Sequence, residues 1–148
     1  MQILIPMSSR SAFFPENDYF FPKPLIEVAG HPMIELVIKQ LKKQLNNPQF
    51  TLIIDREEAR AFSIDRICEL AGGAGTNVIE RMGETSGALC SCLLAIGALD
   101  PSAPVLVANS DQIITADLGA LIERFEMAHV DAGVVTFDSI HPRWSYVV

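Results

Sequence analysis

The chain has 148 residues, 49% hydrophobic and only 7% aromatic, which favours a single domain with an aliphatic core. Its net charge of -7 argues against general nucleic-acid binding, because phosphate backbones require a basic surface. A small phosphorylated ligand held by one or two cations is not excluded. No apolar run approaches the roughly 20 residues that span a bilayer, and the first residues lack a signal peptide's basic region. We therefore expect a cytoplasmic protein without a membrane partner.

The first half of the chain alternates apolar runs with helical patterns. Ile3–Pro6 predicts a first, central strand, and a long loop follows it. Phe50–Ile54 predicts a second strand, and Asn77–Ile79 a short third one. Between these strands, one helix is predicted to begin at Pro32 and a second to run from Glu57 to about Ala71. The first helix carries Lys39, Lys42 and Lys43 opposite its apolar side, which consists of Ile34, Val37, Ile38, Leu41 and Leu45.

The second half continues the alternation. A helix is predicted from about Ser86 to Leu99, and Val105–Ala108 predicts a fourth strand. Asp117 is expected to cap a further helix, because a carboxylate there can accept hydrogen bonds from the first free N–H groups. Ala132–Phe137 and Trp144–Val148 predict two more strands. The capped helix would bury Leu118, Leu121, Ile122 and Phe125.

This order predicts one α/β domain over residues 1–148, with a Rossmann-like, mostly parallel sheet and helices on both faces. In such sheets, ligands bind beyond the carboxyl ends of the strands. The loop after the first strand and the turn at Asp111 after the fourth strand both fall there. Val148 lies inside an apolar run with no turn after it. We therefore expect a domain that is incomplete at its C-terminus, or an edge shielded by another subunit in a homo-oligomer.

Lys23 is the first candidate site residue. It lies between Pro22 and Pro24, whose fixed φ angles stiffen the backbone. A stiff backbone holds the ammonium group in one place, which suits a phosphate ligand. The alternative is a solvated lysine in a rigid loop.

Asp111 is the second candidate. A carboxylate at the carboxyl end of a strand can hold Mg²⁺, which commonly takes one or two carboxylates together with substrate phosphates. The alternative is an aspartate that only stabilises the turn.

Gly87 is the third candidate, because a glycine at a helix start allows close backbone approach to an anion or to the polar edge of a base. A simple helix cap is the alternative. The segment from Gly72 to Gly75 follows a helix and is interpreted as a loop. The three cysteines are interpreted as buried reduced thiols, with Cys90 and Cys92 on different faces of one helix. The three histidines have no partners at catalytic or metal-binding spacing.

Several motifs together resemble one family. The segments FPKPLIEVAGHPMIELVIKQL, TSGALCSCLLAI and VLVANSDQII resemble, in this order, the N-terminal part of the sugar-phosphate nucleotidyltransferases. The likeness is strongest to the bacterial group of capsular and surface polysaccharide synthesis. It covers nearly the whole chain, and the block from PKPL to PMI is its most specific part.

The resemblance implies that the protein transfers a nucleotidyl group from a nucleoside triphosphate to a sugar 1-phosphate, with release of pyrophosphate and with Mg²⁺ as cofactor. It also implies catalytic roles for Lys23 at the phosphates and for Asp111 at the metal. Gly87 would lie against the base, and the loop after the first strand would wrap the triphosphate. The implied nucleotide-binding residues of that loop are Pro6, Met7, Ser8, Ser9, Arg10 and Ser11.

The chain departs from the family pattern in this loop. Ser9 and Ser11 stand at the two glycine positions, and Phe13 stands at the position of the catalytic arginine. A serine at positive φ is strained by about 1 kcal/mol or more, and charge-stabilising groups contribute about 10²-fold or more to rate. Two other family elements, a second aspartate and a Glu-Lys pair, would fall beyond Val148. The alternative hypothesis is therefore a catalytically degenerate homologue that binds nucleotide or sugar phosphate as a regulatory or assembly partner.

Overall fold

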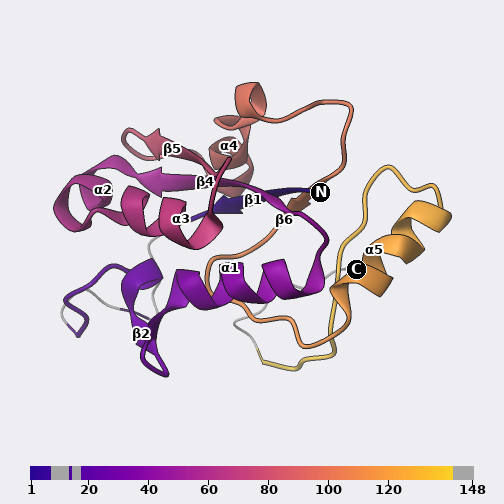
Figure 1. The fold of residues 1–148 in the computed structure, drawn as a ribbon, viewed down its shortest axis with the longest axis horizontal. Coiled ribbons are helices and arrows are strands. Elements are labelled where there is room, and N and C mark those ends of the chain that lie inside the picture. Colours follow the sequence, from indigo (N-terminus) through magenta and orange to yellow (C-terminus); the bar gives the residue numbers. More distant parts are fainter. Residues whose placement is uncertain (8–13, 15–17, 142–148) are drawn as a thin grey trace. The chain divides into compact units, whose positions relative to one another are not determined.

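A computed structural model describes residues 1–7, 14 and 18–141. The chain divides into two compact units, Met1–Ala116 and Asp117–Val148. The first unit contains a four-stranded sheet in the order β5-β4-β1-β6, and all of its neighbouring strands are parallel (Figure 1). The strands are β1 (Gln2–Pro6), β4 (Gln49–Asp55), β5 (Asn77–Arg81) and β6 (Val105–Val107). The predicted α/β fold and the central position of the first strand are confirmed.

Helices cover both faces of this sheet (Figure 1). On one face, α4 (Ala88–Leu93) lies against β1, and Ala95 packs with Leu4 and Ile53. Side chains alternate between the faces of a strand, so Phe50 points to the opposite face. On that face, the Lys42 ammonium of α1 (Met33–Gln44) lies 6.0 Å from the centroid of the Phe50 ring. The helix α3 (Ile64–Gly72) packs against both α1 and β4.

A short turn and a hairpin connect β1 to α1. The 3-10 turn η1 (Lys23–Leu25) precedes the antiparallel strands β2 (Glu27–Val28) and β3 (His31–Pro32). The two residues between these strands, Ala29 and Gly30, have φ angles of 52° and 82°. Positive φ at both central residues is the pattern of the tight hairpin turn whose twist matches its strands.

The prediction of a single helix from Glu57 to Ala71 is wrong, because the chain forms two helices there. They are α2 (Arg56–Phe62) and α3, and Ser63 between them adopts the left-handed conformation with φ 55° and ψ 39°. The buried residues Ala59 and Ile64 are five positions apart, which does not match the spacing of one helical face. The break at Ser63 allows both side chains to face the core.

The helix predicted from Ser86 to Leu99 is also shorter than expected. It consists of α4 followed by the 3-10 turn η2 (Ile96–Ala98). Only a narrow stripe packs inward, with Ser91 and Ala95 buried while Leu89 and Ile96 are exposed. Burial of so little surface does not support a longer regular helix.

The second unit contains α5 (Leu118–Met127), which Asp117 caps as predicted, because its carboxylate accepts a hydrogen bond from the Ala120 N–H at 3.0 Å. The strand predicted at 132–137 is not formed, and these residues are exposed. A strand requires a neighbour for its ladder of hydrogen bonds, and none is paired with this segment among the described residues. The predicted strand at 144–148 lies outside the described residues.

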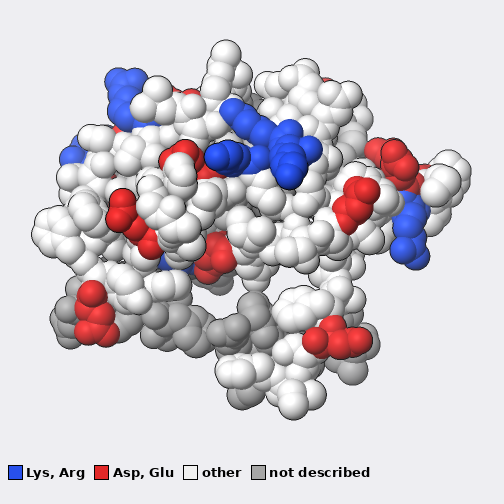
Figure 2. All heavy atoms as spheres, turned by 60° about the horizontal axis from the view of Figure 1, so that its bottom comes forward, with Lys and Arg blue, Asp and Glu red and all other residues white. Residues whose placement is uncertain are grey.

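Charge is unevenly distributed over the surface. The side of α1 that faces solvent carries Lys39, Lys42 and Lys43, as predicted, and Figure 2 shows basic side chains gathered in one patch. Lys42 also donates to the Ala71 carbonyl at 2.7 Å and so joins α1 to α3. Across the described residues, no helix is long and apolar enough to cross a membrane.

The three cysteines differ in their environments. Cys68 is buried as predicted, and Cys92 is half-buried against the cluster formed by Leu4, Ile53 and Ala95. Cys90 is exposed, so its predicted burial is wrong. α4 packs against the sheet through a narrow stripe of its surface. Because Cys90 and Cys92 point to different faces of the helix, as predicted, only Cys92 lies near that stripe.

Candidate phosphate and metal site

Polar residues gather where the parallel strands end. β4 ends at Asp55, β5 ends at Arg81, and the turn with Asp111 follows β6. The turn η1, which carries Lys23, also lies at this edge, because Lys23 contacts Asp111 there. This is the edge of an α/β sheet at which ligands bind.

Lys23 and Asp111 meet at this edge. The Lys23 ammonium donates to Oδ2 of Asp111 at 3.3 Å, although the two residues are 88 positions apart in the chain. The Lys23 side chain is only 12% exposed, and that of Asp111 is 31% exposed. The two candidates that the sequence identified separately therefore form one ion pair, in a place that a ligand can still reach.

The turn η1 fixes the position of Lys23. Pro22 precedes it in extended conformation with φ -62° and ψ 155°, and its carbonyl accepts a hydrogen bond from the Leu25 N–H at 2.8 Å. Pro24 and Leu25 are buried, and their packing anchors the turn. With both flanking prolines constrained, the lysine side chain leaves the backbone in a defined direction.

Hydrogen bonds on both sides of the turn and a buried neighbouring residue hold the turn that carries Asp111. The Ala108 N–H donates to the Leu4 carbonyl at 3.0 Å and so extends the pairing between β6 and β1. Ser110, next to Asp111, is only 2% exposed. Beyond the turn, the Ile114 carbonyl accepts hydrogen bonds from two glutamine side chains of α1. The carboxylate is therefore displayed on an anchored segment.

A second ion pair lies at the ends of β4 and β5, and the sequence reasoning missed it. Arg81 donates to Oδ2 of Asp55 at 3.0 Å, and Oδ1 of the same carboxylate accepts from the N–H groups of Glu57 and Glu58. Asp55 thus caps α2 and also joins two strand ends. The available signal was an aspartate directly between an apolar strand and a helix, which is a capping pattern.

Gly87 precedes α4 with φ 133°, a conformation that favours glycine. A Cβ atom at this position would meet nothing within 4 Å, so the space beside the backbone is open. The nearby Thr85 and Ser91 hydroxyl oxygens lie 2.6 Å apart and share a hydrogen bond across the start of the helix. The backbone at Gly87 is therefore accessible, as a contact with a flat ligand would require.

The other predicted loop residues have different positions. Pro6 ends β1 and is half-buried. Met7 is 3% exposed, and its N–H donates to the Ile53 carbonyl at 2.8 Å, so its side chain belongs to the core. The remaining predicted nucleotide-binding residues lie outside the described residues, and so does Phe13; they are Ser8, Ser9, Arg10 and Ser11.

Asp111 was predicted to hold Mg²⁺, and its surroundings can be compared with what that ion requires. No group of three or more His, Cys, Asp or Glu side chains that could hold a metal ion occurs in the part of the chain that the structure describes. Asp111 offers a single accessible carboxylate. Mg²⁺ commonly takes one or two carboxylates and completes its octahedral shell with phosphate oxygens and water. The residues therefore fit a Mg²⁺ ion that arrives with a phosphate ligand.

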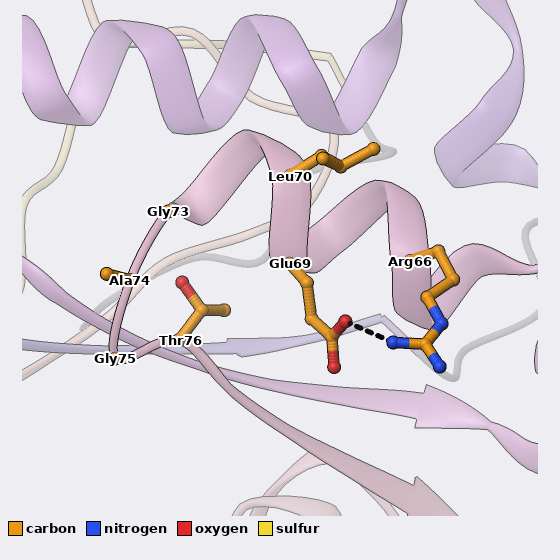
Figure 3. Close-up of a pocket in the computed structure, with 7 residues that line it drawn as sticks. All are labelled: Arg66, Glu69, Leu70, Gly73, Ala74, Gly75 and Thr76. Carbon is orange, nitrogen blue, oxygen red and sulfur yellow. Dashed lines mark hydrogen bonds and ion pairs between the residues drawn. The ribbon is translucent and has the colours of Figure 1, made fainter.

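A pocket of about 580 Å³ lies elsewhere, at the start of β5 (Figure 3). It is lined by Arg66, Glu69, Leu70, Gly73, Ala74, Gly75 and Thr76. Its two charged side chains are already paired, because Arg66 donates to Glu69 at 3.0 Å. The pocket adjoins the amino end of a parallel strand, and Lys23 and Asp111 lie beyond the carboxyl ends. It is consequently a separate feature from the candidate site.

Comparisons with known proteins define the class of fold. No family model and no curated protein matches the sequence. The fold is similar to that of a nucleoside-diphosphate-sugar pyrophosphorylase from Vibrio cholerae RC9, at 23% identity and a TM-score of 0.61 over 74% of this chain and 47% of that one. It is also similar to a candidate glucose-1-phosphate thymidylyltransferase from Bacillus anthracis, solved in complex with a sucrose. There the identity is 18% and the TM-score 0.63, over 85% of this chain and 50% of the other.

Both comparisons establish a shared α/β fold. The chain spans about half the length of these two solved chains. In this protein, Lys23 and Asp111 lie together at the sheet edge where such folds bind ligands.

Proposed function

We propose that this chain is a sugar-phosphate nucleotidyltransferase-type domain, which transfers a nucleotidyl group from a nucleoside triphosphate to a sugar 1-phosphate. The observation that carries the proposal is the Lys23–Asp111 pair of 3.3 Å at the carboxyl edge of the sheet. It combines a constrained cation for phosphate oxygens with a carboxylate for Mg²⁺. The nucleotide-sugar pyrophosphorylase among the structures of similar fold supports the same general kind of function.

In the proposed reaction, an oxygen of the sugar 1-phosphate forms a bond to the α-phosphorus of the triphosphate. The bond from that phosphorus to the bridging β-oxygen breaks, and pyrophosphate leaves. Lys23 would bind and orient the triphosphate by neutralising its oxygens, and Asp111 would hold the metal ion. Mg²⁺, when bound, neutralises charge on the phosphate oxygens. The residues thus contribute mainly by positioning and charge stabilisation, as in phosphoryl transfer generally.

Gly87 would lie against the nucleotide base. Its φ of 133° and the open space beside it support this role, because a flat base could approach the backbone closely. The resemblance of the PKPL-to-PMI block suggests a product used for surface polysaccharides. Nucleoside triphosphates are cytoplasmic, and we propose that compartment for the reaction.

Pyrophosphate release with Mg²⁺, a panel of nucleoside triphosphates and a panel of sugar 1-phosphates tests this proposal. Release should depend on both substrates, and Lys23→Met and Asp111→Asn should each lower it by about 10²-fold or more. Lys39→Met, at an exposed position of α1, serves as the matched control and should retain the rate. Absence of release with every substrate pair would overturn the assignment of catalytic activity.

One sequence observation favours a second candidate function. Phe13 stands at the position of the resembled family's arginine, and Ser9 and Ser11 stand at its glycines. A protein with these replacements could bind nucleotide or sugar phosphate without turnover, as a regulatory or assembly partner. Nucleotide binding without pyrophosphate release would support this candidate. Appearance of release in Phe13→Arg would identify the missing arginine as the cause.

A further inference from the structure

Two side chains of α1 hold the segment that follows Asp111. Nε2 of Gln40 donates to the Ile114 carbonyl oxygen at 2.6 Å, and Nε2 of Gln44 donates to the same oxygen at 2.9 Å. The two glutamines are four residues apart and therefore lie on the same side of the helix. One backbone carbonyl, three residues beyond Asp111, thus accepts hydrogen bonds from two amides.

Gln40 occupies this position at an energetic cost. Its Oε1 atom is buried and has no hydrogen-bond partner among the described residues. Leaving a buried acceptor unsatisfied costs about 1–3 kcal/mol. If α1 needed only to pack here, an apolar side chain of similar size would serve better. The amide is therefore best explained by the bond that its Nε2 makes to Ile114.

The helix α1 is also linked to the segment that carries Lys23. The turn η1 packs against α1, and the Met33 N–H at the start of α1 donates to the Ile26 carbonyl at 3.0 Å. One end of α1 is thus tied to the lysine segment. The other end is tied, through Gln40 and Gln44, to the aspartate segment. The two segments that carry the ion pair are thus linked to the same helix.

We propose that Gln40 and Gln44 are positioning residues that hold Asp111 opposite Lys23 through the Ile114 carbonyl. The part of this inference that concerns metal and phosphate binding rests on the proposed function. Groups that orient a metal ligand typically change metal affinity by 10–100-fold when they are removed. The pair Gln40–Gln44 should therefore influence the site without touching the ligand.

The first test needs no ligand. Gln40→Met, Gln44→Met and the double variant remove one or both donors at nearly constant volume, and each single variant keeps one hydrogen bond. In each variant we expect faster amide hydrogen exchange over residues 111–116 and several-fold faster acylation of Lys23. Both rates should rise moderately in the single variants and most in the double variant. The exposed Lys43 is the internal reference for acylation. The control Lys39→Met should match the wild type, and unchanged exchange and acylation in the double variant would overturn the inference.

The second test measures binding of Mn²⁺–tripolyphosphate by electron paramagnetic resonance. This probe offers metal and phosphates without a base. We expect the double variant to bind it about tenfold more weakly. In an Asp111→Asn background, the two substitutions should cause no further loss, because their effect passes through that carboxylate. An equal additional loss in that background would indicate a general structural effect and overturn the positioning role. A wild-type chain that binds no probe would contradict the proposed function, and the ligand-free test would still decide the role of the glutamines.

Discussion

At the scale of single residues, Asp55 shows how one carboxylate can join three elements. It ends β4, accepts two N–H groups at the start of α2, and pairs with Arg81 at the end of β5. The side chain of Arg81 is only 9% exposed, and that of Asp55 is 23% exposed. Hydrogen bonds to charged groups in such surroundings contribute about 1.5–3 kcal/mol each, which is more than an exposed ion pair gives.

Two substitutions of Asp55 should separate its roles. Asp55→Asn retains an oxygen that can cap α2, but its NH2 group replaces the oxygen that accepts from Arg81, so it should cost that charge-assisted hydrogen bond, about 2 kcal/mol. Asp55→Ala should cost about 1 kcal/mol more, because the cap is lost as well. Urea unfolding measures both values. Equal stability of the asparagine variant and the wild type would show that the ion pair contributes nothing.

The raised pKa of the buried Cys68 thiol should make the stability of the protein depend on pH. Burial, with the charges of Asp65 and Glu69 adding to it, raises the pKa of this thiol from 9.0 to about 12. Between these values, the unfolded chain loses a proton that the folded chain keeps. The free energy of unfolding should therefore fall as the pH rises from 9 toward 12, by up to about 1.4 kcal/mol per pH unit from this group.

Denaturant unfolding at pH 8, 9 and 10 measures this slope. Cys68→Ala should be less stable at every pH but should show a flatter decline above pH 9, because the titrating group is gone. Cys90→Ala, at an exposed position, should retain the wild-type slope. A Cys68→Ala variant with the same slope as the wild type would contradict the linkage.

At the scale of elements, the hairpin between η1 and α1 contains an avoidable strain. Ala29 adopts φ 52° in the turn between β2 and β3. The left-handed conformation costs most residues about 1–2 kcal/mol, and asparagine tolerates it better than alanine does. We expect Ala29→Asn to raise the free energy of unfolding by about 0.5–1 kcal/mol. Ala61→Asn, at an exposed position of α2, is the control and should lower it slightly.

The elements that the sequence predicted well are those whose pattern is set locally. Within their end residues, β1 is an apolar run and β4 is apolar apart from Thr51, and α1 keeps its buried side chains at helical spacing throughout. The break at Ser63 could not be predicted, because a serine adopts the left-handed conformation only when packing on both sides requires it. The segment 132–137 has the composition of a strand, but its ladder depends on a partner elsewhere in the chain.

In the candidate site, too, some features could be predicted from local sequence patterns and others could not. Lys23 and Asp111 could be predicted to converge, since parallel topology brings the ends of β1 and β6 to one edge. The pairing of Arg81 with Asp55 depends on the register of β5 against β4, which no local pattern reveals. The roles of Gln40 and Gln44 were hidden for another reason. A glutamine on a helix looks like a solvated residue until the segment that it contacts is known.

At the scale of the whole molecule, sheet order determines which distant residues can act together. β1 lies between β4 and β6, so the carboxyl ends of β1 and β6 lie side by side. Parallel strands then align these exits in register, with Leu4 opposite Val107. Lys23 and Asp111 can therefore share a site, although they are 88 positions apart in the chain.

If Asp111 holds a metal ion as proposed, its ion pair with Lys23 affects the order in which ligands bind. The ammonium already pairs with Oδ2 of that carboxylate, and it would repel a second cation there. In that case Lys23 would compete with the metal for the carboxylate until a phosphate binds the ammonium. We expect Lys23→Met to bind free Mn²⁺ about tenfold more tightly than the wild type, while it binds tripolyphosphate more weakly. Equilibrium dialysis with each ligand alone measures both affinities, and equal Mn²⁺ affinity in Lys23→Met and the wild type would contradict this competition.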